Sequence, residues 1–450
     1  MSSSSKREIR LSALRDALNA AGTLKSAQRM IAAMHPTEVA LMLESLPPRQ
    51  RELVWEFVDK DIEGDVLLEL NEKVRQELID EMETEELIAA AEGMELDDLA
   101  DLVGDLPETV TLQVLRSLDQ RDRERLRNVL AWPDDSAGGL MNTDTVSVRA
   151  DVTLEVVLRY LRMRGKLPAR TDSLFVVDRH DIYLGTVPLT GIITGNPEDA
   201  VGDSLDTEAP RIDPETAASE VAQLFQDRDL VSAAVVGADG KLIGRITIDD
   251  VVDVIRHEAE HSVFSMAGLQ DEENVFAAII PSTRRRLVWL GVNLATAFLA
   301  AGVVKSFEGT IEKVASLAAL MPVVASMGGI AGTQTVTLII RGLALGQVQW
   351  SNARWLLFKE IAVGALNGLI WSVVVGLVTV LWFGTWKIAI IIAAAMLINL
   401  LAAATVGVLV PLALRRMEID PALSAGVILT TFTDCIGFAT LLGLGAVFLT

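Results

Sequence analysis

The sequence predicts a multidomain membrane protein, because three stretches of different character follow one another along 450 residues. The first is polar and amphipathic in helical units, the second alternates short strands with helices in two similar halves, and the third holds five long apolar spans. Of the 61 acidic residues, 55 precede Arg286. We therefore expect an all-α superhelical amino-terminal domain, a tandem α/β domain, a connecting helix and a five-helix transmembrane domain, with bounds 1–136, 137–262, 263–285 and 286–450.

The amino-terminal stretch, from residue 10 to about 130, shows a weak internal repeat. The segment from His35 to Pro47 recurs as the segment from Glu95 to Pro107. Repetition of this kind predicts stacked helical hairpins. Asp97 and Asp101 share one helical face, where like charges repel unless a cation lies between them. An ordinary solvated face is the alternative interpretation.

The charge distribution limits the classes of partner. The front half is strongly acidic, which argues against nucleic acid and against an anionic membrane surface, and suits weak binding of several divalent cations. A merely solvated acidic surface would look the same. Cys435 is the single cysteine, so an internal disulfide is excluded. The first ten residues lack the apolar core of a signal peptide, so we expect the front half to be cytosolic.

The middle stretch repeats a strand–turn–strand pattern. The segment from Ser173 to Val187 is echoed by the segment from Ser232 to Asp250. Two such halves resemble a tandem CBS pair, a regulatory module that often binds adenine nucleotides. Thr247 and Asp250 match the ribose and phosphate positions of that family in the second half. The first half has Gly185-Thr186-Val187-Pro188 instead, so ATP binding rests on the second half alone.

The five apolar spans are each long enough to cross about 30 Å of hydrocarbon. Their predicted bounds are Leu287–Phe307, Leu317–Leu345, Trp355–Phe383, Ile388–Leu414 and Leu423–Leu449. With the amino terminus inside, the clusters at 284–286, 341–359 and 415–416 fall on the cytosolic side, and only Lys305, Lys313 and Lys387 fall outside. This distribution predicts a multi-pass protein of the cytoplasmic (inner) membrane with its amino terminus cytosolic.

One carboxylate, Asp434, lies in the last span after a run of threonines. A charge at that depth costs about 2.5–3.5 kcal/mol on insertion scales, so it is expected to face protein, water or an ion. The glycine-rich segment 327–335 in the second span predicts close helix packing or a broken helix. Hydroxyl oxygens near both features suit Mg²⁺, a hard cation that keeps its water. A neutral acid buried in a helix bundle is the alternative.

Residues 257–261, His-Glu-Ala-Glu-His, satisfy the H-E-x-x-H pattern of zinc peptidases. Two histidines on one helical face are not a catalytic site without a third ligand and a cleft. A match of five residues also arises readily by chance. We therefore expect no enzymatic activity, and only occasional metal binding at this segment.

Taken together, the chain resembles the MgtE family of magnesium channels over essentially its full length. The resemblance is carried by residues 133–141 (Pro-Asp-Asp-Ser-Ala-Gly-Gly-Leu-Met), the paired middle domain, the glycine-rich second span, and Asp420-Pro421-Ala422 leading to Thr430–Asp434. It implies a homodimer in the lipid membrane, with a pore between two copies of the second and fifth spans. The pore would hold hydrated Mg²⁺ at Asp434, assisted by Gly329, Thr333, Thr337, Thr430 and Thr433.

The resemblance also implies a gate controlled by cytosolic Mg²⁺. Ions would bridge the acidic faces of the helical and CBS domains and pull a connecting helix, roughly Val263–Ser282, across the pore. The positions that match this sensor are Asp97, Asp101, Gly138, Asp229, Asp250, Asp253 and Glu258. Mg²⁺ would thus be both substrate and regulator.

The chain departs from the family pattern at several positions. Ile330 stands where Asn is usual, and Val427 where Pro is usual, so an amide oxygen near the pore is lost. Around the sensor, family acids are replaced at four positions: Ala217, Ser219, His261 and Ser262. We expect closure to need more Mg²⁺ than a fully acidic sensor would, or to tolerate other divalent ions through His261.

Two other functions fit parts of the sequence. A cation-coupled secondary transporter of divalent metals such as Co²⁺ or Mn²⁺ would also use a buried acid. Glu360 in the third span is a second titrating candidate, unless it is a helix-end acid beside Lys359. A receptor that conducts nothing and only reports ion or nucleotide state is the remaining class. Flux that follows a pH or sodium gradient would favour the transporter, and absence of flux the receptor.

Overall fold

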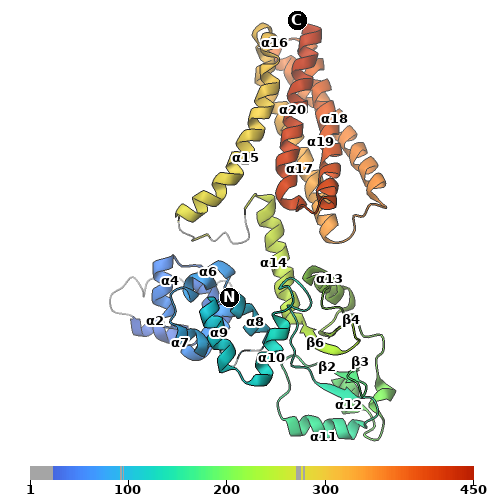
Figure 1. Cartoon of the computed structure of the whole chain (residues 1–450). Helices are drawn as coiled ribbons and strands as arrows, with labels where there is room; N and C mark the ends of the chain where they lie inside the picture. Colours follow the sequence, from blue (N-terminus) through green and yellow to red (C-terminus); the bar gives the residue numbers. More distant parts are fainter. Residues whose placement is uncertain (1–23, 92–93, 95, 270–274, 277–278, 450) are drawn as a thin grey trace. The chain divides into compact units, whose positions relative to one another are not determined.

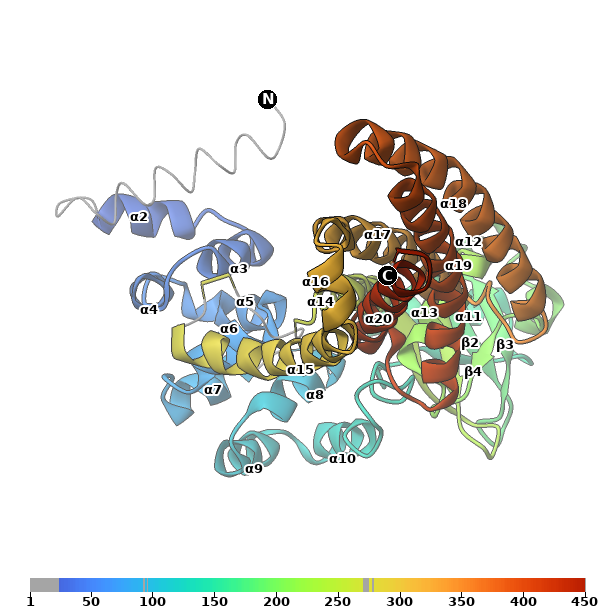
Figure 2. The same ribbon diagram turned by 90° about the horizontal axis from the view of Figure 1, so that it is seen from above.

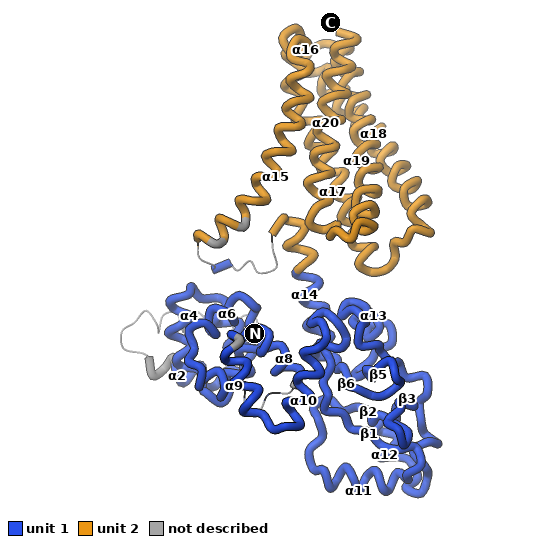
Figure 3. The backbone as a smooth tube through the Cα atoms, in the orientation of Figure 1, with its two compact units in different colours: residues 1–260, 272–278 blue, residues 261–271, 279–450 orange. Residues whose placement is uncertain are grey.

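The computed structural model describes residues 24–91, 94, 96–269, 275–276 and 279–449. The expected helical start at residues 10–23 lies outside these ranges. Two compact units divide the chain: residues 1–260 with 272–278, and residues 261–271 with 279–450 (Figures 1 and 3). Each unit is described separately.

The first unit begins with a series of short helices. They are α2 (Leu24–Ile31), α3 (Pro36–Glu44), α4 (Pro48–Trp55), the 3₁₀ turn η1 (Lys60–Ile62), α5 (Glu63–Glu69), α6 (Glu72–Ile79), α7 (Thr84–Ala91), α8 (Leu96–Asp105), α9 (Glu108–Ser117) and α10 (Gln120–Val129). The repeat noted in the sequence has the same structure twice: α3 and α8 each lead to a proline, Pro47 or Pro107, that caps the next helix. The predicted helical amino-terminal domain is confirmed.

Side-chain caps and one buried arginine fix these short helices. Asn71 and Asp119 accept the backbone N–H groups of Val74 and Asp122 at 3.0 and 2.8 Å, and so cap α6 and α10. Arg51 is buried, donates to the carbonyls of residues 43 and 46 near the end of α3, and pairs with a glutamate of α6. A buried charge needs such full pairing to be tolerated.

The second part of this unit holds two similar sheets. The first contains β1 (Ser147–Arg149), β2 (Ser173–Val177) and β3 (Tyr183–Pro188), with α11 (Leu154–Arg164), α12 (Leu189–Thr194) and the 3₁₀ turn η2 (Val201–Ser204); the second contains β4 (Arg211–Ile212), β5 (Ser232–Val236) and β6 (Leu242–Thr247), with α13 (Ala218–Arg228). Each sheet has a parallel first pair and an antiparallel second pair. The register shifts after Val176 in one and after Val235 in the other, so the predicted tandem repeat is confirmed.

One continuous hydrophobic core joins the helical part to the second sheet. It runs from Ile31 in α2 to Val251 at the start of α14 (Ile248–Met266), and includes residues of α13 and β5. The first sheet has a separate core. Acidic side chains of α8 and of α14 are therefore held within one packed body.

The second unit contains the membrane helices. They are α15 (Ile279–Lys305), the short α16 (Glu308–Lys313), α17 (Ser316–Ala344), α18 (Ala353–Phe383), α19 (Trp386–Arg416) and α20 (Pro421–Leu449). In the described residues, five of these helices are long and apolar enough to span a membrane, as the sequence predicts. The helix α16, between the first two spans, was not predicted.

The helix α19 forms the centre of this bundle, where it packs on α17, α18 and α20. Viewed from above, α15 and α18 lie on opposite sides of this group (Figure 2). Both of these outer helices expose large apolar side chains, among them Leu290, Phe298, Leu366 and Leu381. Exposed apolar surface of this extent is suited to lipid or to a second copy of the chain.

The connecting helix differs from the prediction of a helix over Val263–Ser282. The helix α14 starts in the second sheet's domain and ends at Met266, and α15 begins at Ile279. Gly268, with φ of 71°, adopts the left-handed conformation that commonly follows a helix end. Residues 270–274 and 277–278 of the predicted helix lie outside the described residues.

Candidate functional site

The carboxylate of Asp434 lies near the middle of the 29-residue helix α20. Its side chain is partly buried, and within the described residues it has no hydrogen-bond or ion-pair partner. Thr430, one turn before it, is exposed, and its hydroxyl donates to the carbonyls of Gly426 and Val427 at 3.1 and 3.0 Å. Each such hydroxyl keeps lone pairs free to accept from a water molecule. Asp434 and Thr430 thus present oxygen atoms that accept no hydrogen bond from the described residues.

The glycine-rich segment of α17 remains helical throughout, so the expectation of a broken helix is wrong. Close packing is the correct alternative. A Cβ on Gly328 would lie 2.2 Å from Nδ2 of Asn399, and one on Gly332 would lie 2.6 Å from Cδ1 of Leu429. The glycines let α17 approach α19 and α20 closely.

Another face of α17 is open within the single chain. Gly329, Thr333 and Thr337 follow one another at helical spacing, and a Cβ on Gly329 would meet no atom within 4 Å. Thr333 and Thr337 are exposed, and the Thr333 hydroxyl donates to the Gly329 carbonyl at 2.8 Å. Ile330, beside them, is 56% exposed. No described part of the same chain covers these predicted site residues.

Thr433 does not share this exposure. It is completely buried, and its hydroxyl donates to the carbonyl of Thr430 at 3.1 Å. Because Thr430 and Thr433 lie three residues apart on α20, one faces outward while the other is enclosed. The structure therefore separates Thr433 from the exposed predicted site residues.

A second intramembrane acid, Glu360, is buried with 4% of its surface exposed. Its carboxylate contacts the Lys359 ammonium at 2.5 Å and accepts from the Thr335 hydroxyl of α17 at 3.3 Å. The predicted pairing with Lys359 is present, but the acid points into the bundle. The charge of Glu360 is balanced by the Lys359 ammonium, whereas Asp434 has no such cation among the described residues.

In the first unit, the structure brings together acids that are far apart in sequence. Asp250, in the first turn of α14, lies close enough to Asp97 of α8 for the two charges to interact. Burial raises the pKa of Asp250 to about 8, helped by repulsion from Asp249 and Asp97 and opposed by hydrogen bonds from Thr247. A carboxyl in such surroundings favours a bound proton or a metal cation over the free anion.

Asp101 belongs to the same group of acids. Desolvation raises the pKa of Asp101 to about 6; Arg75 opposes the rise, and Asp97, Asp134 and Asp105 add to it. The residue as a whole stays exposed, so water screens these charges and Asp250 is the stronger indicator. Asp134, in the motif of residues 133–141, is near enough to act on Asp101 but was not among the predicted sensor residues.

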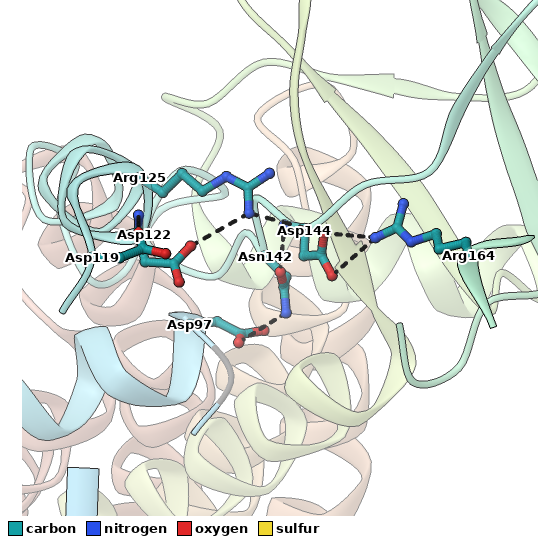
Figure 4. A network of polar contacts seen from close by, with 7 residues as sticks. All are labelled: Asp97, Asp119, Asp122, Arg125, Asn142, Asp144 and Arg164. Carbon is teal, nitrogen blue, oxygen red and sulfur yellow. Dashed lines mark hydrogen bonds and ion pairs between the residues drawn. The ribbon is translucent and has the colours of Figure 1, made fainter. Parts of the chain in front are cut away.

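Polar contacts connect these acids to the start of the paired-sheet domain (Figure 4). Asn142 donates to Asp97 at 3.0 Å, and its own oxygen accepts the backbone N–H of Asp144 at 2.7 Å. Asp144 in turn pairs with Arg164 of α11 at 3.1 Å and with Arg125 of α10 at 4.0 Å. Sequence reasoning missed this network, whose only local signal is the Asn-x-Asp spacing that is typical of an Asx turn.

The remaining predicted sensor residues are more dispersed. Asp229 caps α13 in a left-handed conformation, Asp253 pairs with Arg256 at 3.2 Å, and Glu258 is exposed on α14. Gly138 is buried, and a Cβ there would lie 2.3 Å from Cγ of Trp132. Over the described ranges, no three His, Cys, Asp or Glu side chains are arranged to hold one ion.

The predicted nucleotide residues contact each other. The Thr247 hydroxyl lies 2.5 Å from Asp249 and 3.1 Å from Asp250, and Asp249 pairs with Arg170 at 2.6 Å. His261, from the H-E-x-x-H segment, contacts Asp420 at 3.5 Å and Ser265 at 3.5 Å. Asp420 is also the cap of α20, because it accepts the N–H groups of residues 422 and 423.

These features describe a multi-pass membrane protein with a helical domain and a paired-sheet domain, and comparisons with known proteins assign it to the transporter class. Residues 321–444 match the family described as MgtE, divalent cation transporter, residues 34–135 match the MgtE intracellular N domain, and residues 137–195 and 201–257 match CBS domains. The chain belongs to the MgtE family of magnesium transporters.

Named relatives cover nearly the whole chain. It is 24% identical over 428 residues to the magnesium transporter MgtE of Bacillus subtilis, covering 95% of each protein. It is 29% identical over 422 residues to the magnesium transporter MgtE of Thermus thermophilus, covering 92% of this chain and 93% of the relative. The crystal structure of the cytosolic domain of the Mg²⁺ channel MgtE in complex with ATP aligns with 28% identity and a TM-score of 0.49, over 54% of this chain and 99% of that one.

Proposed function

We propose that this magnesium transporter is a homodimeric Mg²⁺-selective channel for uptake across the cytoplasmic membrane. The observation that carries the proposal is the carboxylate of Asp434, which lies near the middle of α20 and has no protein partner in the described residues. A charge in that position is costly unless an ion or water neutralises it. A hydrated Mg²⁺ would supply a positive charge for this carboxylate. Its water molecules would also donate hydrogen bonds to the carboxylate and to the Thr430 oxygen.

The open face of α17 supports a pore shared by two copies of the chain. Gly329, Thr333 and Thr337 are polar or small residues in a membrane helix, yet no residue within the described ranges of the same chain covers them. A two-fold axis beside this face would place the same residues of a partner opposite. Both copies of Asp434 would then serve one ion path.

The orientation follows from the basic residues. The clusters at the start of α15, at the end of α17 and at the end of α19 all fall on one side when the amino terminus is cytosolic. This distribution supports a cytosolic location for the acidic first unit, where it would sense the transported ion.

The sensor proposal rests on Asp97 and Asp250. They belong to different domains of the first unit and repel each other. Cytosolic Mg²⁺ between them would favour a closed state, and its loss an open one. The continuous helix α14, which starts at Asp250's turn and ends at Met266, is the element that would relay the change.

ATP binding at the second CBS half is a weaker proposal. It rests on the match of Thr247 and Asp250 to family positions, and both side chains are already bonded to each other. Binding would need these bonds to open. Calorimetric titration of the full chain with ATP, beside Thr247→Val, tests it; equal binding by both proteins would exclude this site.

The test of the channel is Mg²⁺ entry into liposomes that contain the purified chain. We expect fast entry without any pH or sodium gradient, loss of entry in Asp434→Asn, and suppression by several millimolar Mg²⁺ on the side of the first unit. Thr440→Val is a matched control: Thr440 is partly buried on α20, but its hydroxyl only bonds back to its own helix. Entry that persists in Asp434→Asn would refute the assignment of the pore.

A cation-coupled transporter remains a second candidate, favoured by the buried Glu360. In such a transporter, a proton or sodium ion would bind Glu360 in exchange for its contact with Lys359. Metal flux would then require a pH or sodium gradient, and Glu360→Gln would abolish the coupling. Flux without a gradient, unaffected by Glu360→Gln, would exclude this candidate.

A further inference from the structure

The side chain of Asn399, near the middle of α19, is completely buried in the apolar bundle. A buried amide costs free energy unless its donors and its acceptor find partners. Only part of this requirement is met. Nδ2 donates to the carbonyl of Val324 in α17 at 2.9 Å, whereas Oδ1 has no hydrogen-bond partner in the part of the chain that the structure describes.

Two glycines form the slot that holds this amide. A Cβ on Gly328 of α17 would lie 2.2 Å from Nδ2 of Asn399, and a Cβ on Gly437 of α20 would lie 2.9 Å from the same atom. Neither position could carry a side chain without moving the amide. Asn399 therefore fills a gap between α17 and α20 that only glycines leave open.

The slot lies beside the proposed ion site. Gly328 immediately precedes Gly329, the first residue of the open face of α17, and Gly437 follows Asp434 by less than one helical turn. The contact that Asn399 makes is directional, because its N–H must meet the carbonyl of one residue, Val324. If α17 slid by one turn along α19, which also packs on α20, this hydrogen bond would be lost.

We propose that Asn399 is a positioning residue that fixes the axial register of α17 against α20, and thereby sets Gly329 and Thr333 opposite Asp434. The inference rests on the proposed channel function. A purely packing role is less consistent with the structure, because leucine has a similar shape and would fill the slot without leaving an unpaired oxygen. Single buried polar groups are known to specify register in helical assemblies at a cost in stability.

The first test compares Asn399→Leu with the wild type in three measurements on the full-length protein: Mg²⁺ entry into liposomes, thermal unfolding, and cross-linking between α17 and α20. We expect Mg²⁺ entry to fall about ten-fold or more, since small displacements of a functional group are costly. The temperature of unfolding should stay the same or rise, because an apolar side chain replaces a partly unsatisfied amide.

Cross-linking measures the register without any transport. Gly332→Cys and Leu429→Cys are introduced together in a Cys435→Ala background, because a Cβ on Gly332 would lie only 3.0 Å from Cγ of Leu429. That separation is compatible with a disulfide. We expect rapid oxidative cross-linking, slowed when Asn399→Leu is added.

A second pair of variants tests the same inference in case Asn399→Leu does not fold. Gly328→Ala should impair Mg²⁺ entry and slow the cross-linking by displacing the amide, and Asn399→Ala in that background should lower entry little further, because the contact is already lost. The matched control is Gly376→Ala, at the contact of α18 with α19, where a Cβ would meet Ala389 at an ordinary 3.6 Å. It should leave entry and cross-linking unchanged.

The outcomes separate the register proposal from the channel proposal. Reduced cross-linking together with reduced Mg²⁺ entry supports the inference. Unchanged entry, or reduced entry with unchanged cross-linking, overturns it. If the wild type shows no Mg²⁺ entry but cross-linking still depends on Asn399, the channel proposal fails while the assignment of register stands.

Discussion

The pKa of Asp250, raised to about 8 by burial and by repulsion from Asp249 and Asp97, makes Mg²⁺ binding at the sensor depend on pH. A carboxyl must lose its proton before it can bind Mg²⁺. With a pKa of about 8, about one molecule in eleven is ionised at pH 7 and about ten in eleven at pH 9. The dissociation constant for Mg²⁺ at this site should therefore fall about ten-fold between pH 7 and pH 9.

The same shift affects stability in the absence of Mg²⁺. The pKa of Asp250 is higher in the folded protein than the ordinary value of 3.8, so the folded state binds more protons between these values. Stability from this group is fully present below pH 3.8 and is lost as the pH rises through about 8. In EDTA, the temperature of unfolding should fall between pH 6 and pH 9, and saturating Mg²⁺ should reduce that fall.

Isothermal titration of the full chain in detergent, in two buffers of different ionisation enthalpy, measures both the affinity and the protons released. At this site we expect release of about 0.9 proton per ion at pH 7 and about 0.1 at pH 9. Asp250→Asn should abolish both the release and the pH dependence. Asp239→Asn is the matched control, because Asp239 lies in the same CBS half, is exposed, and has its pKa lowered by the N–H of Lys241. An equal proton release in Asp250→Asn and wild type would refute the reasoning.

Three further predictions concern the membrane unit. Glu360→Gln should leave Mg²⁺ entry without a gradient within about two-fold of wild type but lower stability by about 1–3 kcal/mol, measured by thermal unfolding, because a buried pair is broken. Gly332→Ala should lower stability by about 1–3 kcal/mol in thermal unfolding, since its Cβ would lie 2.6 Å from Leu429, and Leu429→Ala in the same protein should recover part of that stability. His261→Asp should lower the Mg²⁺ concentration for closure about five-fold or more in flux measurements, because the new acid would face Asp420, which His261 contacts at 3.5 Å, and a cation would relieve their repulsion; an unchanged midpoint would contradict this.

Much of the architecture could be predicted because its signals are local and strong. Five apolar spans predict membrane helices by their length and composition. The two β-rich halves repeat each other in sequence, and their sheets have the same shift of register. The short helix α16 escaped prediction, since six residues are too few to show a helical period. The connecting helix was placed too late because the helix that leaves the CBS domain, α14, continues without a break to Met266.

The candidate sites were harder to predict, because they depend on contacts between distant segments. Glycines in α17 were compatible with a broken or a closely packed helix, and only the partners Asn399 and Leu429 decide for packing. A single asparagine in an apolar span gives no indication of its function until its neighbours are known. Likewise, the proximity of Asp97 to Asp250 depends on the core that joins two domains, and from sequence it followed only from family resemblance.

The placement of the protein's own cations separates structural acids from candidate metal ligands. Glu77, Asp105 and Glu360 are each paired with an arginine or lysine at 2.5 Å, so they need no further charge. Asp434 and Asp250 have no such partner in the described residues, although both are partly buried. A carboxylate that is shielded from solvent and contacts no protein cation is stabilised most by binding a metal ion. By this criterion Asp253, which pairs with Arg256, should contribute less to Mg²⁺ binding than Asp250 does.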